Sequence, residues 1–313
     1  MKSAPLFFSL PGNEELTHGL VDAVRGEIGD LEARRFPDGE TYLRVGSPCA
    51  GRDVVLVCTL VCPDDKLEAV LFAAEAMRDM NAPRVVLVAP YLAYMRQDRR
   101  FQTGEAVTSR YVAGILSQHL DALVTVDPHL HRYASLGEIY SIPTFVAHSA
   151  PLLAAWVKRE IARPLLIGPD SESKQWVANV AELAGAAYVI SAKVRRGDRS
   201  VEISIPDVER YRDYTAVLVD DIISTGRTMV ETIKHLKQVG LRSPICLGIH
   251  GVFAGDAYDA LVAAGAGRIA TSDTIPHPTN AIRILSILAP QVQSALSAPL
   301  RDRPRRQPDE GEP

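Results

Sequence analysis

Short runs of apolar residues alternate with stretches of helical spacing along this chain, and this alternation limits its fold more than any other feature. The runs are apolar on almost every residue, as strands buried on both faces are. They span residues 53–60, 84–90, 122–129, 164–170, 186–193, 216–221, 243–253 and 267–275. Amphipathic helices are predicted between them, at residues 67–80, 108–120, 173–185 and 228–240. Strands alternating with helices predict an α/β fold whose mainly parallel sheets are covered by helices.

The strand and helix series occurs twice, before and after about residue 150. We therefore predict two similar domains, an N-terminal one over residues 1–147 and a C-terminal one over residues 148–296, which opens with a connecting helix. Residues 33–45 differ, because they alternate around the turn Pro37-Asp38-Gly39 and so predict a hairpin. Residues 297–313 are charged and rich in proline, which predicts a disordered tail.

Composition excludes some classes of function. Hydrophobic residues make up 47% of the 313, enough for a sizeable core, and the net charge of −4 argues against a nucleic-acid partner bound by bulk electrostatics. The four cysteines lack zinc-site spacing, so reduced thiols are expected. No apolar run approaches the roughly 20 residues of a membrane span. Without a signal-peptide pattern, the expected location is cytoplasmic and no membrane partner is expected.

The segment 217–229, VLVDDIISTGRTM, carries the strongest chemical signal. A predicted buried strand ends in the carboxylates Asp220 and Asp221, which suit the vicinal hydroxyls of a ribose. The loop that follows opens a helix, and its backbone N–H groups and hydroxyls would form a cradle for an anion. The loop residues of this cradle are Ser224, Thr225, Gly226 and Thr228. The alternative is a helix cap beside two solvated acids.

This segment resembles the phosphoribosyl-diphosphate-binding loop shared by type I phosphoribosyltransferases and ribose-phosphate pyrophosphokinases. Other segments resemble the pyrophosphokinase family alone. Arg96, Gln97 and Asp98 match its PY-x-x-Y-x-RQD segment, which contacts ATP; from the residues alone they could be a solvated basic loop. Lys193 and Arg195 match its Lys-x-Arg on a mobile loop that closes over ATP, and alone would be only a basic turn.

The resemblance extends to metal and adenine contacts. Asp127 and His129 match the family's Asp-x-His, whose histidine lies near the metal and the transferred phosphates, with Pro128 where many members have leucine. Asp170 matches a Pro-Asp that helps to hold magnesium, although it could also start a helix. Three residues of the predicted hairpin also match the family, in which this hairpin reaches from a neighbouring subunit to hold the adenine of ATP. These residues are Phe36, Asp38 and Glu40.

The resemblance implies an enzyme that transfers the β,γ-diphosphoryl group of ATP to O1 of ribose 5-phosphate, giving phosphoribosyl diphosphate and AMP. It implies Mg²⁺ as cofactor, His129, Lys193 and Arg195 as catalytic residues, and a homo-oligomer that shares the ATP site. Two alternatives stay open: a non-catalytic, regulatory synthetase-like subunit and a type I phosphoribosyltransferase. His131 and Arg227 have no assigned role.

Overall fold

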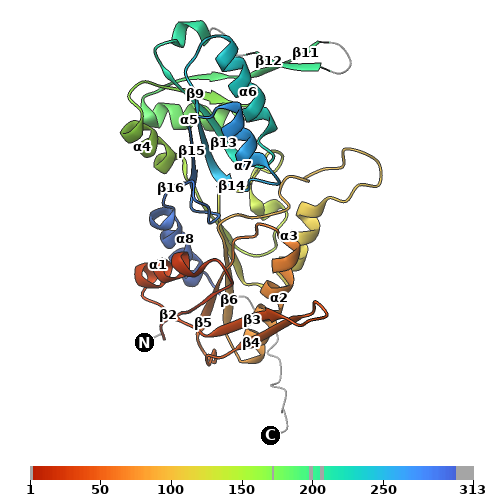
Figure 1. The fold of residues 1–313 in the computed structure, drawn as a ribbon. Helices are drawn as coiled ribbons and strands as arrows, with labels where there is room; N and C mark the ends of the chain where they lie inside the picture. Colours follow the sequence, from red (N-terminus) through yellow and green to blue (C-terminus); the bar gives the residue numbers. More distant parts are fainter. Residues whose placement is uncertain (1–2, 171–172, 197–199, 205–207, 301–313) are drawn as a thin grey trace. The chain divides into compact units, whose positions relative to one another are not determined.

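The computed structural model describes residues 3–170, 173–196, 200–204 and 208–300. They form two compact units. The N-terminal unit comprises the chain up to Ala147 together with the segment from Leu285 onward, and the C-terminal unit comprises residues 148–284. Each unit is built around its own six-stranded sheet (Figure 1). Among the described residues, no helix is long and apolar enough to cross a membrane.

The sheet of the N-terminal unit is parallel throughout, in the order β2-β1-β5-β6-β7-β8. Its strands are β1 (Leu6–Ser9), β2 (Glu27–Ile28), β5 (Asp53–Val57), β6 (Arg84–Ala89), β7 (Ala122–Val126) and β8 (Thr144–Ala147). Its helices are α1 (Glu14–Val24), α2 (Asp64–Asp79), α3 (Thr108–His119) and α8 (Leu285–Ser297), with the 3-10 turn η1 (Leu136–Glu138). Every residue of β5, β6 and β7 is buried, which explains their almost uninterrupted apolar sequences.

The sheet of the C-terminal unit is also parallel, in the order β10-β9-β13-β14-β15-β16. Its strands are β9 (Pro164–Gly168), β10 (Ala187–Ile190), β13 (Thr215–Ile223), β14 (Ile245–Gly251), β15 (Arg268–Ser272) and β16 (Asn280–Ile282). Its helices are α4 (Ala150–Glu160), α5 (Lys174–Ala184), α6 (Arg227–Gln238) and α7 (Ala257–Ala264), with the 3-10 turn η2 (Val208–Tyr211). Leu218, Ile233 and Leu261 belong to its buried apolar core.

The two units share one topology. In each, the first strand lies between the second and the third, and an antiparallel hairpin is inserted after the second strand. The hairpin of the N-terminal unit is β3 (Leu31–Arg35) with β4 (Thr41–Val45), and that of the C-terminal unit is β11 (Ala192–Arg196) with β12 (Ser200–Ser204). The predicted α/β fold with two similar parallel sheets is confirmed, and the repeated hairpin shows that the similarity extends to the insertions.

Two predicted elements agree with the structure in their position, and one predicted strand is two strands. The helix predicted to end at Gly185 does so, and this glycine adopts the left-handed conformation with φ of 64°. The hairpin predicted around Pro37-Asp38-Gly39 is present as β3–β4. The apolar run 186–193 is not a single strand, because β10 ends at Ile190 and β11 begins at Ala192 in a different sheet.

Helix α8 corrects the predicted domain assignment. Its residues were expected to end a C-terminal domain spanning 148–296, but α8 packs against α1, β6, β7 and β8 of the N-terminal unit. The physical reason is its apolar face, since Leu288, Val292 and Ala295 are buried there. The predicted disorder of residues 297–313 concerns a segment that lies outside the described residues from Arg301 onward.

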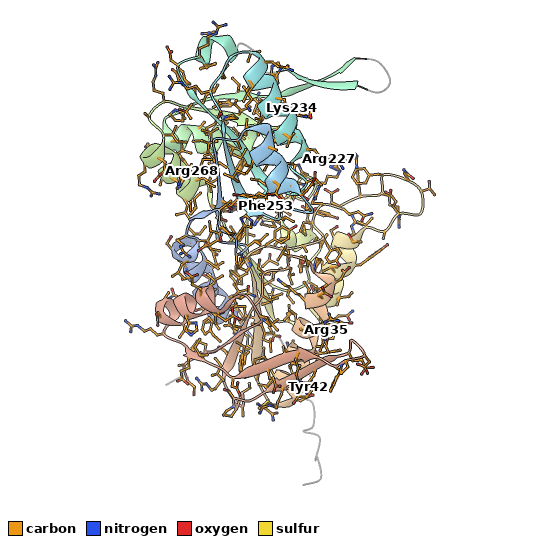
Figure 2. The ribbon with its side chains drawn as sticks, viewed as in Figure 1. Arg35, Tyr42, Arg227, Lys234, Phe253 and Arg268 are labelled. Atoms are coloured by element: carbon orange, nitrogen blue, oxygen red, sulfur yellow. The ribbon has the colours of Figure 1, made fainter. Side chains whose placement is uncertain are left out.

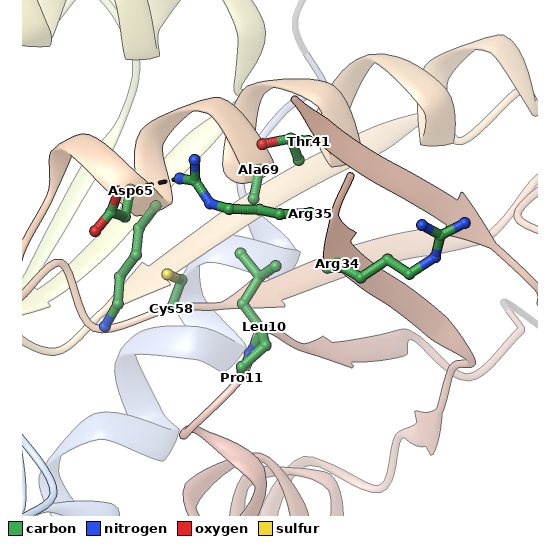
Figure 3. A pocket seen from close by; sticks show the side chains of 10 residues that line it. Leu10, Pro11, Arg34, Arg35, Thr41, Cys58, Asp65 and Ala69 are labelled. Atoms are coloured by element: carbon green, nitrogen blue, oxygen red, sulfur yellow. Dashed lines mark hydrogen bonds and ion pairs between the residues drawn. The ribbon is translucent and has the colours of Figure 1, made fainter. Parts of the chain in front are cut away.

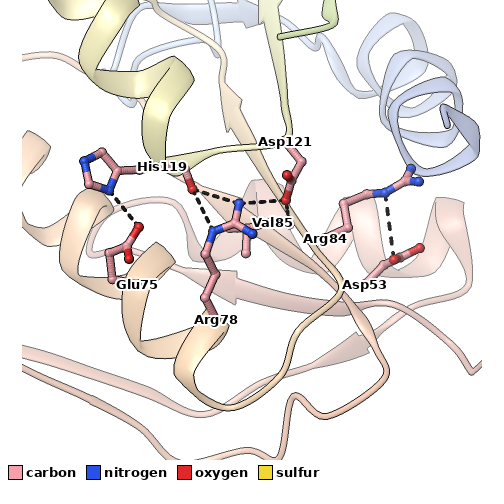
Figure 4. Close-up of polar contacts among 7 residues, drawn as sticks. All are labelled: Asp53, Glu75, Arg78, Arg84, Val85, His119 and Asp121. Atoms are coloured by element: carbon pink, nitrogen blue, oxygen red, sulfur yellow. Dashed lines mark hydrogen bonds and ion pairs between the residues drawn. The ribbon is translucent and has the colours of Figure 1, made fainter. Parts of the chain in front are cut away.

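Arg84, the first residue of β6, holds the end of α8. Its side chain is 3% exposed, and its Nη1 and Nη2 donate to the carbonyl oxygens of Ala295 and Ala298, each at 2.5 Å. Its Nε lies 3.8 Å from Oδ1 of the buried Asp53 (Figure 4). The last carbonyls of a helix have no partner within the helix and carry partial negative charge, so a buried guanidinium satisfies them.

A half-buried arginine of α2, Arg78, contacts the end of α3 and the residue that precedes β7 (Figure 4). Arg78 donates from Nη2 to Oδ2 of Asp121 at 2.7 Å and from Nε and Nη2 to the carbonyl of His119. The same Asp121 oxygen accepts the backbone N–H of Val85 at 2.8 Å. The Asp121 carboxylate thus connects Arg78 of α2 to the backbone of Val85 near the start of β6.

Replacing Arg84 by methionine is expected to destabilise the protein by about 3–5 kcal/mol, because Asp53 stays buried without its cation and the carbonyls of α8 lose their donors. Thermal and urea unfolding of the purified variant measure this loss. Arg44→Met is the matched control: Arg44 is 57% exposed and pairs with Glu32 at 3.3 Å, so it should cost at most about 1 kcal/mol. Equal effects of the two substitutions would contradict the role given to Arg84.

Candidate functional site

The carboxyl ends of β9 and β13 define the candidate site of the C-terminal unit. These strands are neighbours, and they lie where the strand order reverses, with β10 on one side and β14 on the other. Ligands of parallel α/β sheets bind beyond the carboxyl ends of strands at such a point. Asp170 follows β9, and Asp220 and Asp221 lie in the last part of β13. The topology therefore brings together the three carboxylates that the sequence analysis selected in this unit.

The three carboxylates influence one another. Burial raises the pKa of Asp220 well above its usual range, and the negative charge of Asp221, a hydrogen bond with Asp221 and the charge of Asp170 raise it further. The backbone N–H of Asp221 donates to Oδ1 of Asp220 at 3.0 Å and opposes this effect. The group holds more negative charge than it can keep ionised at low cost, and a bound cation or a sugar hydroxyl donor would relieve it.

The loop after β13 has the backbone of an anion cradle. Gly226 immediately precedes α6 with φ of 65°, a conformation that favours glycine. Ser224, Thr225 and Gly226 lead directly into the first turn of α6, where Thr228 lies. No acidic residue occupies that first turn, so its backbone N–H groups keep their attraction for an anion. Arg227 is the exposed first residue of α6 (Figure 2).

A second loop, which follows β14, holds this one in place through backbone hydrogen bonds. The backbone N–H of Phe253 donates to the carbonyl of Ile223 at 2.9 Å, and that of Ala254 to the carbonyl of Ser224 at 3.1 Å. Phe253, labelled in Figure 2, has φ of 43°, an uncommon value for an aromatic residue. Its ring lies 4.5 Å from that of His277 and 5.7 Å from that of Tyr258. A pattern within one sequence cannot reveal such a brace, because its donors are backbone groups.

Asp170 serves the start of α5 as well as the carboxylate group. Its Oδ1 accepts the backbone N–H of Ser173 at 3.1 Å, and its carbonyl accepts the Ser173 hydroxyl at 2.7 Å. Asp170 thus takes part in the turn that leads into α5, whose N-cap residue is Ser173.

The loop after β6 in the N-terminal unit carries Arg96, Gln97 and Asp98. Arg96 is exposed, whereas Asp98 is 8% exposed and lies 3.7 Å from the guanidinium of Arg132. The carbonyl of Asp98 accepts the Tyr133 hydroxyl at 3.1 Å. Asp98 therefore links this loop to the segment after β7, whereas the Arg96 side chain is exposed.

Asp127 and His129 follow the end of β7. Asp127 has φ of 30°, in the left-handed region that aspartate enters more readily than most residues. Its backbone N–H donates to the carbonyl of Ala147 at the end of β8, at 3.1 Å. His129 is half-buried. A strained residue at a strand end, held by the neighbouring strand, is typical of functional sites.

The β3–β4 hairpin presents its tip to solvent. Phe36 is 40% exposed, and Asp38 and Glu40 are exposed as well. The tip is ordered by its own backbone, because Phe36 donates to the carbonyl of Glu40 at 2.8 Å and the Arg34 guanidinium lies 4.9 Å from the Phe36 ring. The three predicted adenine-contacting residues thus occupy one exposed tip.

A cavity of about 190 Å³ lies between this hairpin and the start of α2 (Figure 3). It opens at the carboxyl ends of β1 and β5, with Leu10 and Cys58 in its wall. Arg35 and Asp65 also line the cavity and form an ion pair at 3.0 Å. Burial raises the pKa of the Cys58 thiol to about 11, so this cysteine behaves as an apolar lining residue. The cavity lies at the carboxyl ends of the first and third strands of its sheet, as the carboxylate site does in the C-terminal unit.

Lys193 and Arg195 lie two residues apart in β11, where they pair with Ile203 and Val201 of β12. The resemblance places them on a mobile loop, and the residues alone predict a basic turn; their backbone forms a two-stranded hairpin outside the main sheet. The hairpin follows β10 in the same way as the β3–β4 hairpin follows β2.

Comparison with known proteins agrees with this arrangement. Residues 6–119 match the model of the N-terminal domain of ribose phosphate pyrophosphokinase, and residues 135–275 match that of the phosphoribosyl transferase domain. The chain is 33% identical over 262 residues to the ribose-phosphate pyrophosphokinase of Sulfolobus acidocaldarius, covering 82% of this chain and 88% of that protein. It is 32% identical over 282 residues to that of Methanopyrus kandleri, covering 90% and 96%.

The crystal structure of phosphoribosylpyrophosphate synthetase from Mycobacterium smegmatis has the same fold, with a TM-score of 0.82 at 23% identity over 94% of this chain and 99% of that one. The chain is thus an α/β protein of two parallel sheets with a phosphoribosyl transferase domain in its second half. It belongs to the ribose-phosphate pyrophosphokinase family, which confirms the resemblance found in the sequence.

Replacing Asp220 by asparagine is expected to stabilise the chelator-treated protein near neutral pH. A carboxyl whose pKa is raised on folding contributes stability below its unfolded pKa of about 3.9, and that contribution is lost as pH rises through the folded value. The gain from asparagine should therefore be about 1 kcal/mol or more at pH 7 to 8 and shrink toward acidic pH, as measured by thermal unfolding at several pH values. Asp213→Asn, at an exposed aspartate, is the control. A gain that does not vary with pH would count against the carboxylate repulsion.

Proposed function

We propose that this protein is a ribose-phosphate diphosphokinase. It transfers the β,γ-diphosphoryl group of ATP to O1 of ribose 5-phosphate and releases phosphoribosyl diphosphate and AMP. The observation that carries the proposal is the end of β13, where Asp220 and Asp221 precede a loop that enters α6 through the left-handed Gly226. Family membership supports the ATP half of the reaction.

The sugar phosphate is held, in this proposal, by the C-terminal unit. The 5-phosphate accepts hydrogen bonds from the backbone and hydroxyl groups of Thr225–Thr228 at the start of α6. Asp220 and Asp221 accept hydrogen bonds from the ribose hydroxyls, so that O1 is fixed in one orientation. Positioning of this kind is a main component of phosphoryl-transfer catalysis. The brace from Phe253 and Ala254 keeps the loop in place without the ligand.

The carboxylates also suit a magnesium ion. Mg²⁺ prefers hard oxygen ligands, and burial, together with the charges of Asp221 and Asp170, raises the pKa of Asp220. We assign Asp170 as a magnesium ligand, with His129 of the N-terminal unit beside the metal and the transferred phosphates, as in the family. When bound, the ion neutralises charge on the polyphosphate.

ATP is contacted by three sets of residues in this proposal. The exposed Arg96 and the neighbouring Gln97 meet the polyphosphate, with Asp98 holding their loop through Arg132. The hairpin tip with Phe36, Asp38 and Glu40 contacts the adenine of the ATP molecule that is bound to a neighbouring subunit. The active protein is therefore a homo-oligomer. Lys193 and Arg195 meet the charge that develops during transfer.

The activity is tested by incubating the protein with ATP, ribose 5-phosphate and Mg²⁺ and measuring AMP and phosphoribosyl diphosphate. Both products are expected, and AMP should not form when ribose 5-phosphate is omitted. A phosphoribosyltransferase would instead consume phosphoribosyl diphosphate when a nucleobase is supplied. Absence of both products would favour the non-catalytic, regulatory subunit.

Lys193→Ala is expected to lower the rate of AMP release by roughly 10³-fold or more while ribose 5-phosphate binding stays nearly unchanged, because the lysine acts on the transferred phosphates and not on the sugar. Initial rates and calorimetric titration with ribose 5-phosphate measure the two effects. Arg196→Ala removes a charge from the last residue of β11 and serves as control. Normal AMP release by Lys193→Ala would refute the assignment.

Phe36→Ala and Lys193→Ala chains are each expected to be nearly inactive, and mixing them should restore activity well above their sum. The reason is that an intact site can combine the hairpin tip of one chain with Lys193 of another. The mixture is prepared by reversible dissociation of the purified variants, and AMP release is assayed. Recovery no greater than the sum would show that each chain supplies both residues to its own site.

A further inference from the structure

His129 and His131 bring two imidazole rings together at the carboxyl end of β7. Nε2 of His131 lies 3.1 Å from Nδ1 of His129, and the ring centroids are 3.8 Å apart with the planes tilted by 56°. His129 is half-buried and His131 is exposed, so the pair can be reached from solvent. His131 has no counterpart in the resemblance described above, and the proposed reaction leaves it without a role.

The separation of these two nitrogens is that of two ligands on one metal ion. Imidazole nitrogens bind zinc and similar ions at about 2.1 Å, and ligand angles of about 90–109° then place two nitrogens about 3.0–3.4 Å apart. The observed 3.1 Å falls within this range. In the absence of an ion one ring donates to the other. A change of tautomer in the donating ring gives both nitrogens a lone pair, and a rotation of the rings directs the two lone pairs to a shared ion.

The backbone around the pair is fixed by anchors on both sides. Asp127 has a left-handed φ of 30°, and the next residue, Pro128, is buried. Leu130, between the two histidines, packs against the apolar core of the N-terminal unit. Tyr133 is 8% exposed and its hydroxyl donates to the carbonyl of Asp98. Both rings therefore stand on a short segment that is held before any ion binds, which lowers the cost of chelation.

We propose that His129 and His131 form a two-nitrogen site for a transition-metal ion of the class that prefers imidazole, such as Co²⁺, Ni²⁺ or Zn²⁺. Mg²⁺ is not its ligand, because that ion selects oxygen donors and loses its water reluctantly. Water molecules or phosphate oxygens complete the coordination shell. Binding does not depend on the proposed synthetase activity, but it occupies His129 and thus adds a second, chemically different cation to the same strand end.

The test is a titration of the full chain with Co²⁺ in the absence of nucleotide, after removal of any affinity tag and treatment with a chelator. Calorimetry gives the stoichiometry and affinity, and the visible absorption of bound Co²⁺ reports nitrogen ligands. His131→Gln is expected to weaken the tightest binding step by at least about 10-fold, because even an outer partner of a metal ligand is commonly worth that much.

His18→Gln is the matched control, since His18 is an exposed histidine on α1 of the same unit. It should leave Co²⁺ binding unchanged, and His129→Gln should weaken it as His131→Gln does. Mg²⁺ titrations and thermal unfolding in chelator should not distinguish His131→Gln from the wild type. Unchanged Co²⁺ affinity in His131→Gln, or an equal loss in His18→Gln, would overturn the proposal. A chain that binds Co²⁺ in this way but makes no phosphoribosyl diphosphate would refute only the proposed function.

Discussion

The parallel direction of all six strands in each sheet is the constraint on which the rest of this structure depends. It places the carboxyl ends of neighbouring strands at one edge, so that Asp170 after β9 and Asp220 in β13 become neighbours although they are far apart in sequence. The same geometry makes these acids expensive to keep ionised. A carboxyl whose pKa is raised by burial and by neighbouring charges is typical of functional sites, which supports the ligand-binding role proposed for these acids.

The two units show how one topology can carry different chemistry. Both insert a hairpin after the second strand, and both reverse strand order between the first and third. At this position the C-terminal unit enters α6 through Gly226, with no acid in the first turn of the helix. The N-terminal unit enters α2 through Pro63, with Asp64 and Asp65 in the first turn. These charges oppose an anion at the helix start, and the space there is a largely apolar cavity, so only one of the two sheets can cradle a phosphate by this means.

The sequence could predict the elements whose signals are local. Buried strands such as β5 and β6 are apolar on nearly every residue, and the end of α5 at Gly185 depends on one residue's backbone freedom. The position of α8 could not be predicted in this way. Its helical pattern does not say which sheet it covers, and the answer depends on Arg84, about 200 residues earlier, which satisfies the carbonyls of Ala295 and Ala298.

The same distinction applies to the candidate site. Asp220, Asp221 and Gly226 could be selected from sequence because strand, acids and loop are contiguous. The burial of Asp98 could not, because its partner Arg132 follows a different strand, nor could the brace from Phe253, whose donor is a backbone group. The tertiary contacts thus separate residues that a motif groups together: within Arg96-Gln97-Asp98, the arginine is exposed and the aspartate is buried against the segment after β7. The proposed roles follow the same division of charge, since the N-terminal unit carries the exposed Arg96, which suits a polyphosphate, whereas the C-terminal unit carries carboxylates, which suit a sugar and a cation.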